Sequence, residues 1–232
     1  MNRYPGFIAG LFLLVSGHLL AGEEPLIDTE DQKVMSSRSF LEAHPDMKYR
    51  TEGWLAYDEG RYEDARKLFT KAAGFGDKLS QAMLAEMAWK GIGQPVDRPL
   101  GYAWADISAE RGYRQFVALR EQYWRQLSDA ERMRAIEIGQ PLLDKYTHAV
   151  TGAALKKELR KARRYMISGR INRGADVVVP GPYGMATVIR GHDFYAEKFW
   201  NAGRYQEWVD EVWTDPPREN VDVGAPITIG AE

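Results

Sequence analysis

Residues Gln81 to Gly112, with the sequence QAMLAEMAWKGIGQPVDRPLGYAWADISAERG, decide the fold of this chain. Apolar and small residues recur every three or four positions in the first half of the stretch and again in the second half. That spacing is typical of a helix that buries one face. Gly91 and Gly93 interrupt the pattern between the halves, and Gly112 ends it. The stretch therefore predicts two helices joined by a glycine-containing turn.

A second pair of helices is predicted immediately before this stretch. Trp54 and Tyr57 belong to a segment with few helix breakers, which ends at Gly60. The next segment carries an apolar stripe at the i, i+3, i+4 and i+7 positions of a helix. The members of this stripe are Ala65, Leu68, Phe69, Ala72 and Ala73. The pattern therefore predicts a helix, a turn and a second helix that stops at Gly76.

A third pair is predicted after Gly112. Residues 115–126 form its first helix. Ser128 and Glu131 then have the spacing of a capping box, in which the two side chains bond to each other's backbone N–H groups. This box opens a sixth helix that runs to about Tyr146.

The helix pairs repeat at a regular interval. The sequence AAGFG at Ala72–Gly76 aligns with SAERG at Ser108–Gly112, 36 residues further on. The small residues allow close helix approach, and both final glycines suit the left-handed conformation that ends a helix. One helix pair cannot bury its apolar face alone, so successive pairs must stack. We therefore predict an all-α fold, a short α-solenoid of stacked helix-turn-helix repeats over residues 47–149.

The stretch Gln81–Gly112 resembles a Sel1-like repeat of the tetratricopeptide-like superfamily. The family pattern is a helix, a G-x-G turn, an aspartate, a second helix with an aromatic residue, and a closing A-A-x-x-G. The matching residues here are Gly91 and Gly93, Asp97, Trp104, Ser108–Ala109 and Gly112. Ser108 replaces the usual alanine, and residues 54–76 are closer to a tetratricopeptide unit. The resemblance covers residues 47–146 and implies an adaptor of protein complexes, a class that is exported in many bacteria.

Candidate binding residues follow from repeat geometry, because the first helix of each pair tends to line the concave face of a helical stack. These candidates are Trp54, Tyr57, Glu86, Trp89 and Lys90. An alternative interpretation places Trp54 and Trp89 in the core. The resulting hypothesis is an exported adaptor that holds a protein or peptide partner of the cell envelope.

The N-terminal residues are typical of a secretory signal. Arg3 precedes an almost wholly apolar or small segment, FIAGLFLLVSGHLLA from Phe7 to Ala21, and acidic residues follow. We predict a cleavable signal peptide over residues 1–21, hence export, with a periplasmic location. The alternative is an uncleaved membrane anchor, although the segment is shorter than the ~18–20 apolar residues that span a bilayer. Residues 22–46 are predicted to be a mobile leader with a short helix.

Residues 150–232 are predicted to be a C-terminal extension of three parts. The segment Lys156–Arg173 has eight basic residues and one acidic residue, and its apolar stripe predicts a docked helix. Its alternative role is a surface for anionic lipid or an acidic partner. Two β-prone runs around Pro180–Pro182 predict a small β-hairpin or an extended arm.

The last part of the extension, from Asp193, is acidic and aromatic, with nine acidic and three basic residues. It predicts either another helix pair or an element that covers the last helix. An extended tail follows from Thr214. The basic and acidic segments are also expected to pair with each other within one fold.

The sequence offers little catalytic chemistry. There is no cysteine, which excludes thiol catalysis and cysteine-bound metal. No two histidines have the spacing of a zinc site, and no nucleophile elbow or P-loop occurs. We therefore predict no enzyme activity, no cofactor and no metal, and the net charge of −2 argues against nucleic acid as a partner. The alternative is an envelope hydrolase or glycan-binding accessory protein that uses carboxylates of the extension, among Asp193, Glu197, Glu207 and Asp210.

Overall fold

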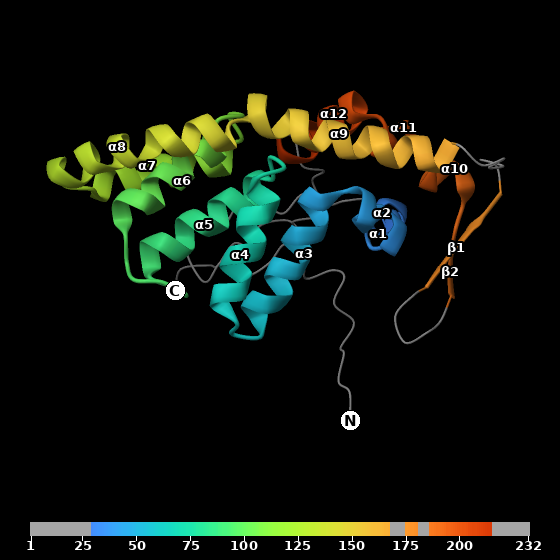
Figure 1. The fold of residues 1–232 in the computed structure, drawn as a ribbon, viewed down its shortest axis with the longest axis horizontal. Helices are drawn as coiled ribbons and strands as arrows, with labels where there is room; N and C mark the ends of the chain where they lie inside the picture. The colour runs from blue at the N-terminus through green and yellow to red at the C-terminus, as the bar shows by residue number, and fades with distance from the viewer. Residues whose placement is uncertain (1–28, 168–174, 181–185, 215–232) are drawn as a thin grey trace, which may run out of the picture.

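Helices make up most of the computed structural model, which describes residues 29–167, 175–180 and 186–214 (Figure 1). A two-stranded antiparallel sheet lies in the C-terminal part. The predicted all-α class with a small β-hairpin is therefore confirmed. The predicted signal peptide and the tail after Thr214 lie outside the described residues.

Six helices form the repeat region, and each corresponds to a predicted one. They are α3 (Pro45–Asp58), α4 (Tyr62–Ala73), α5 (Lys78–Lys90), α6 (Arg98–Ala109), α7 (Arg114–Gln126) and α8 (Asp129–Tyr146). Helices α3 and α4 pack as one hairpin and α5 and α6 as the next, while α7 and α8 both pack against α6. One core runs through all six and includes Trp104, Phe116 and Tyr123.

Local signals set the ends of these helices. Both bonds of the predicted capping box at Ser128 and Glu131 are present at the start of α8. Gly76 and Gly112 have φ angles of 87° and 76°, which confirms their predicted left-handed conformation. An L-residue with a side chain rarely adopts this conformation, so these turns favour glycine.

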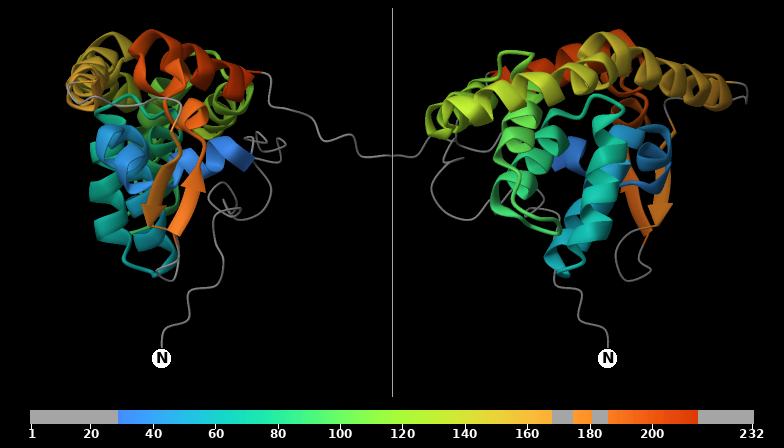
Figure 2. Two further views of the ribbon diagram at one scale, coloured as in Figure 1. Left: turned by 90° about the vertical axis from the view of Figure 1, so that its right-hand side faces the viewer. Right: turned by 60° about the vertical axis from the view of Figure 1, so that its left-hand side comes forward.

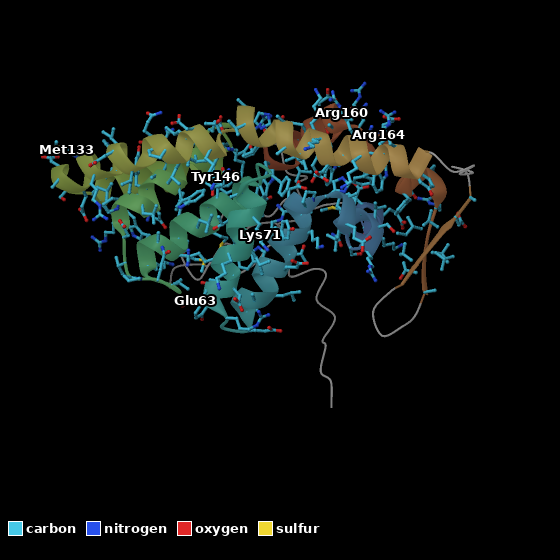
Figure 3. The ribbon with its side chains drawn as sticks, viewed as in Figure 1. Glu63, Lys71, Met133, Tyr146, Arg160 and Arg164 are labelled. Atoms are coloured by element: carbon cyan, nitrogen blue, oxygen red, sulfur yellow. The ribbon has the colours of Figure 1, made fainter. Side chains whose placement is uncertain are left out.

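Helices α8 and α9 (His148–Ile167) run end to end along one edge of the molecule (Figure 1). Tyr146, labelled in Figure 3, marks the junction between them. Its ring lies 4.8 Å from the ring of Trp104, and its carbonyl accepts a hydrogen bond of 3.2 Å from Gln81. The junction is therefore tied to both helices of the second hairpin.

The first and last helices of the described chain share a second core. Helices α1 (Thr29–Met35) and α2 (Arg38–Ala43) precede α3, and α10 (Gly191–Phe194), α11 (Glu197–Trp200) and α12 (Ala202–Thr214) follow the sheet. The second core joins Val34, Phe40 and Met47 from the N-terminal side to Leu159 and Phe199 from the C-terminal side. We call these elements, together with α9 and the sheet, the terminal module.

The short helix predicted within residues 22–46 is present as α2, whereas the preceding segment Thr29–Met35 is also helical and packed rather than part of a mobile leader. Residues 29–43 are largely helical and packed, and α3 begins at Pro45, ahead of the predicted start at residue 47. Proline suits the first turn of a helix because its missing N–H has no partner there in any case. The boundary predicted at residue 150 also falls inside α9, which starts at His148 and includes the described part of the basic segment.

His44 connects the two ends of the chain at the junction of α2 and α3. Its ring is fully buried and stacks on Phe40 with a centroid distance of 3.7 Å. The two ring nitrogens lie 2.8 Å from the carbonyl oxygen of Phe40 and 2.7 Å from that of Phe199 in α11. Burial lowers the pKa of His44 to about 4, so the ring is neutral at pH 7 and donates to one of these carbonyls.

The hairpin pairs β1 (Val177–Pro180) with β2 (Ala186–Ile189), and Val177 is opposite Ile189. Val179 and Ile189 are buried, while Val178 and Val188 face outward, as expected for strands with one covered face. Helix α1 lies beside β2 and α10 (Figure 2). Of the two predicted alternatives, the structure therefore contains the hairpin rather than an extended arm.

Two glycines within helices provide a matched test of this packing. A methyl group on Gly101 of α6 would lie 3.1 Å from the Ala85 carbonyl oxygen and 3.1 Å from the Trp89 amide nitrogen, both backbone atoms of α5. We expect Gly101→Ala to force these helices apart and to lower the free energy of unfolding by about 1–3 kcal/mol in urea denaturation.

The control is Gly139→Ala in α8, where the added methyl would lie 3.8 Å from the Cβ atom of Ala103. That is an ordinary contact, and alanine favours helix over glycine by up to about 1 kcal/mol. We therefore expect this variant to be more stable than the parent. Equal effects of the two substitutions would contradict the close approach of α5 and α6.

Candidate functional site

The five predicted binding residues come from two helices. Trp54 and Tyr57 lie on α3, and Glu86, Trp89 and Lys90 lie on α5. Tyr123 of α7 contacts both Glu86 and Trp89. The first helices of the three predicted pairs therefore contribute to one cluster.

Trp54 lies in the core, as the alternative interpretation proposed. Its side chain packs edge-on against Phe69 of α4, with a centroid distance of 5.7 Å, and the residue is 6% exposed. Gly53 permits this packing, because a methyl group there would lie 2.7 Å from the Phe69 ring. Trp54 is therefore inaccessible to a partner and serves to hold α3 against α4.

Glu86 is a buried carboxylate with two partners. One oxygen accepts a hydrogen bond of 3.2 Å from the Tyr123 hydroxyl, and the other pairs with the ammonium group of Lys90. Burial and the Glu86 charge both raise the pKa of Tyr123 above its usual value. Glu86 is therefore already paired within the chain, and only Lys90, whose side chain is 41% exposed, reaches solvent.

Trp89 is half-buried between an aromatic ring and a cation. It stacks on Tyr123 with a centroid distance of 3.9 Å and an interplanar angle of 9°. The Arg98 guanidinium lies 5.4 Å from the Trp89 ring centroid, within the range of a cation–π interaction. These contacts fix the orientation of the indole ring.

Tyr57 and Tyr62 continue the cluster toward α4. Their rings meet edge-to-face at 5.2 Å, and Tyr62 is 40% exposed. Burial, followed by the Glu86 charge, raises the pKa of Tyr57, which places this tyrosine in the electrostatic field of α5. The turn between α5 and α6 closes over Tyr62, since a methyl group on Gly93 would lie 2.7 Å from the Tyr62 Cβ atom. We call Tyr57, Tyr62, Trp89, Lys90 and Arg98 the aromatic patch.

Sequence reasoning missed three members of this cluster: Tyr62, Arg98 and Tyr123. Tyr123 lies on the first helix of the third predicted pair, so the rule that selected the other residues would also have found it. Tyr62 and Arg98 begin second helices, and they reach the patch only through the fold of the two turns. Neither residue carried a local signal of this position.

Apart from the aromatic patch, a polar cavity lies where the repeat region meets α9 and α12. It is a cavity of about 40 Å³, which is room for a few water molecules. The charged residues in its wall are Asp46, Arg50, Asp77, Lys78 and Arg111. Arg50 and Asp77 form a buried salt bridge of 2.9 Å between α3 and the start of α5.

Asp46 is the most perturbed carboxyl group of this cavity. One of its oxygens accepts a hydrogen bond of 2.6 Å from the buried Tyr205 hydroxyl of α12. The other oxygen is buried and has no hydrogen-bond partner among the described residues. Burial raises the pKa of Asp46 to about 6, against the opposing effect of the Tyr205 hydrogen bond.

Glu110 and Arg111, next to each other in the chain, both connect the repeat region to the terminal module. Lys78 donates to Glu110 at 2.8 Å, and Glu110 also accepts from the backbone of His148 at the start of α9. Arg111 and Tyr113 both bond to Asp210 of α12. Burial alone would raise the pKa of Asp210, but the Arg111 and Tyr113 hydrogen bonds hold it below its usual value.

Each of the four carboxylates considered for a hydrolase has a basic partner within the chain. Asp193 pairs with Arg190, Glu197 with Arg163, Glu207 with Arg204, and Asp210 with Arg111. None of the four is among the residues that line the cavity. The Arg163–Glu197 pair, at 3.3 Å, is one contact between the basic and acidic segments, which were expected to pair. These residues give the hydrolase hypothesis no geometric support.

Comparison with known proteins adds no assignment: no family model matches the chain, and neither a curated protein nor a solved structure matches it. Among the described residues, no group of three or more histidine or acidic side chains is placed to hold a metal ion. No helix within the described ranges has both the length and the apolar character required to cross a membrane.

The buried Asp46 carboxyl predicts a distinct pH dependence of stability. Its pKa is about 6 in the folded chain and about 4 in the unfolded chain, so between these values the folded state binds the extra proton. The contribution of Asp46 to stability therefore rises as the pH falls through this window, whereas that of the buried His44, whose pKa is lowered to about 4, falls. Comparison of an Asp46 variant with the parent separates the two. We expect Asp46→Asn, whose amide oxygen still accepts from Tyr205, to be more stable than the parent at pH 7.5 by about 2–3 kcal/mol.

Urea denaturation from pH 7.5 to pH 4.5 tests this expectation. The advantage of Asp46→Asn should shrink steadily as the pH falls. Asp58→Asn, which changes an exposed carboxylate at the other end of α3, is the matched control and should give a curve parallel to the parent. A constant difference between Asp46→Asn and the parent at every pH would show that Asp46 does not titrate in this window.

Proposed function

We propose that this chain is an exported adaptor that binds a protein or peptide segment through the aromatic patch. The observation that carries the proposal is the convergence of three partly accessible aromatic rings and two cations from α3, α4, α5 and α6. Tyrosine, tryptophan and arginine are the residues that most often dominate binding energy at protein interfaces. The resemblance of residues 81–112 to a Sel1-like repeat supports the same function.

The patch is ordered before any partner binds. Trp89 is held between Tyr123 and Arg98, and Tyr57 is held between Trp54 and Tyr62. Binding would therefore cost little side-chain entropy, which favours affinity for a given contact area. Arg98 is exposed, and the side chain of Lys90, although paired with Glu86, is 41% exposed, so both cationic groups reach the surface. A partner segment with apolar and acidic side chains fits this chemistry.

An adaptor role requires no catalytic group. The size of the cavity beside Asp46 agrees with such a role. The cavity beside Asp46 has room for a few water molecules but not for a sugar or a peptide. Its charged groups bond to one another across helices, which is typical of a structural network. Export of the chain, with the periplasm as its location, rests on the signal-like residues 1–21.

Site-specific photo-crosslinking tests the proposal in the cells that naturally produce the chain. A photoreactive phenylalanine analogue replaces Tyr62, which is 40% exposed in the patch. We expect one discrete covalent adduct with another protein. Adding Lys90→Glu and Arg98→Glu should lower its yield about 10-fold or more, since reversing a contact charge removes an attraction and adds a repulsion.

The matched control places the same analogue at Met133, which is 74% exposed on α8 and labelled in Figure 3 far from the α3–α4 turn. No discrete adduct is expected there. Trp89→Ala is a poorer probe, because loss of the stack on Tyr123 would also disturb the core. Adducts of equal yield from Tyr62 and Met133, or none from Tyr62, would count against the patch as a binding surface.

A further inference from the structure

The outward face of α9 carries an unusual concentration of positive charge. The exposed residues of this helix, as far as its side chains are described, are Ala149, Val150, Ala153, Lys156, Lys157, Arg160, Lys161 and Arg164. The last five are all basic, and none of the eight is acidic. At about 100° per residue, all eight fall within an arc of about 140°. One continuous stripe of the helix is therefore cationic along its second half.

Few of these charges are neutralised by the protein itself. Lys161 lies 3.8 Å from Glu158 and remains 76% exposed. The other four basic residues of the stripe have no acidic partner within 4 Å in the described part of the chain. Arg163, which does pair with Glu197, lies outside the stripe on a partly buried side of α9. The positive potential is thus directed outward.

The opposite face of α9 anchors the helix in the fold. Leu155 and Leu159 are buried in the core of the terminal module, and Thr151 packs against Gly76. The helix is therefore formed and oriented before it meets a ligand. Figure 3 shows Arg160 and Arg164 at the upper edge of the view, on the side of α9 opposite α3 to α5.

The shape of this edge limits what can bind to it. Helices α8 and α9 run end to end along it, with α12 beside α9 (Figures 1 and 2). The stripe follows the convex outward face of α9, and none of its residues lines the cavity described above, so it forms a ridge. A ridge makes its broadest contact with a flat surface, whereas a peptide strand or a helix binds best in a groove. The apolar Val150, 48% exposed, shares the stripe and suits the interfacial region of a bilayer.

We propose that the outward face of α9 binds the surface of a bilayer that contains anionic phospholipid. The contact is electrostatic and peripheral, because Leu155 and Leu159 of α9 are already buried in the protein core. The chain as a whole has a net charge of −2, so attraction depends on this face being turned toward the membrane. Binding would orient the molecule with α9 against the lipid. The inference is independent of the partner proposed for the aromatic patch.

Vesicle co-sedimentation with the full chain tests the proposal. The variant Lys156→Gln/Lys157→Gln/Arg160→Gln/Arg164→Gln removes four exposed charges and keeps a good helix-forming residue at each position. Each basic residue near an anionic surface contributes about 5-fold to affinity, so the variant should bind vesicles of phosphatidylcholine and phosphatidylglycerol at least ~100-fold more weakly. Binding by the parent should also be lost when salt rises from about 0.05 M to about 0.5 M.

The matched control is Arg61→Gln/Lys67→Gln/Arg125→Gln/Arg134→Gln, which makes the same change in net charge at exposed positions outside α9. It should bind like the parent, and both variants carry the same N-terminal sequence, so any contribution of residues 1–21 cancels. Far-ultraviolet circular dichroism verifies that both variants are folded.

Three results would overturn the proposal: equal weakening by the two variants, undiminished binding of the parent to pure phosphatidylcholine, or no binding to anionic vesicles at low salt. Capture of a soluble polyanion, such as polyglutamate, without vesicle binding would assign the face to an acidic macromolecule instead.

Discussion

Asp46 accepts a hydrogen bond from the buried hydroxyl of Tyr205, 159 residues further along the chain. This contact joins the first turn of α3 to α12, and around it the two ends of the chain form one core. His44 and Phe199 make a second connection two residues earlier. Because an unpaired buried carboxylate or hydroxyl is costly, these contacts require both ends to be in place at once. The repeat region therefore has a terminal module on one side instead of an open stack of helices.

Close helix approach is the second constraint, and the aromatic patch depends on it. Gly101 brings the backbone of α6 against α5 beside Trp89, and Gly93 brings the intervening turn against Tyr62. Trp89 can then stack on Tyr123 while its other side meets Arg98. The two glycines thus determine how the rings of Tyr62 and Trp89 are held at the surface.

Charge is distributed in two contrasting ways. At the junction of the repeat region and the terminal module, Arg50, Lys78 and Arg111 are each paired with a carboxylate from another element. Such buried pairs are specific in geometry, since a misplaced partner leaves an uncompensated charge. On the outward face of α9 the cations are exposed and largely unpaired within the described residues. The first arrangement fixes the fold, and the second is suited to an external ligand.

The sequence by itself determined the helices and their ends. Apolar periodicity, the capping box at Ser128 and the glycines at 76 and 112 are local signals, and each acts through a few neighbouring residues. They predicted the six helices of the repeat region and the hairpin. They also predicted three of the five patch residues, Tyr57, Trp89 and Lys90, whereas the candidates Trp54 and Glu86 proved to be buried. Only the tertiary structure decided that residues 29–43 pack with the C-terminal extension, that Tyr123 supports Trp89, and that Asp46 is buried beneath Tyr205. The physical reason is that these contacts join segments distant in sequence, and the stability of such a contact depends on the shape and polarity of both surfaces, which no local pattern encodes.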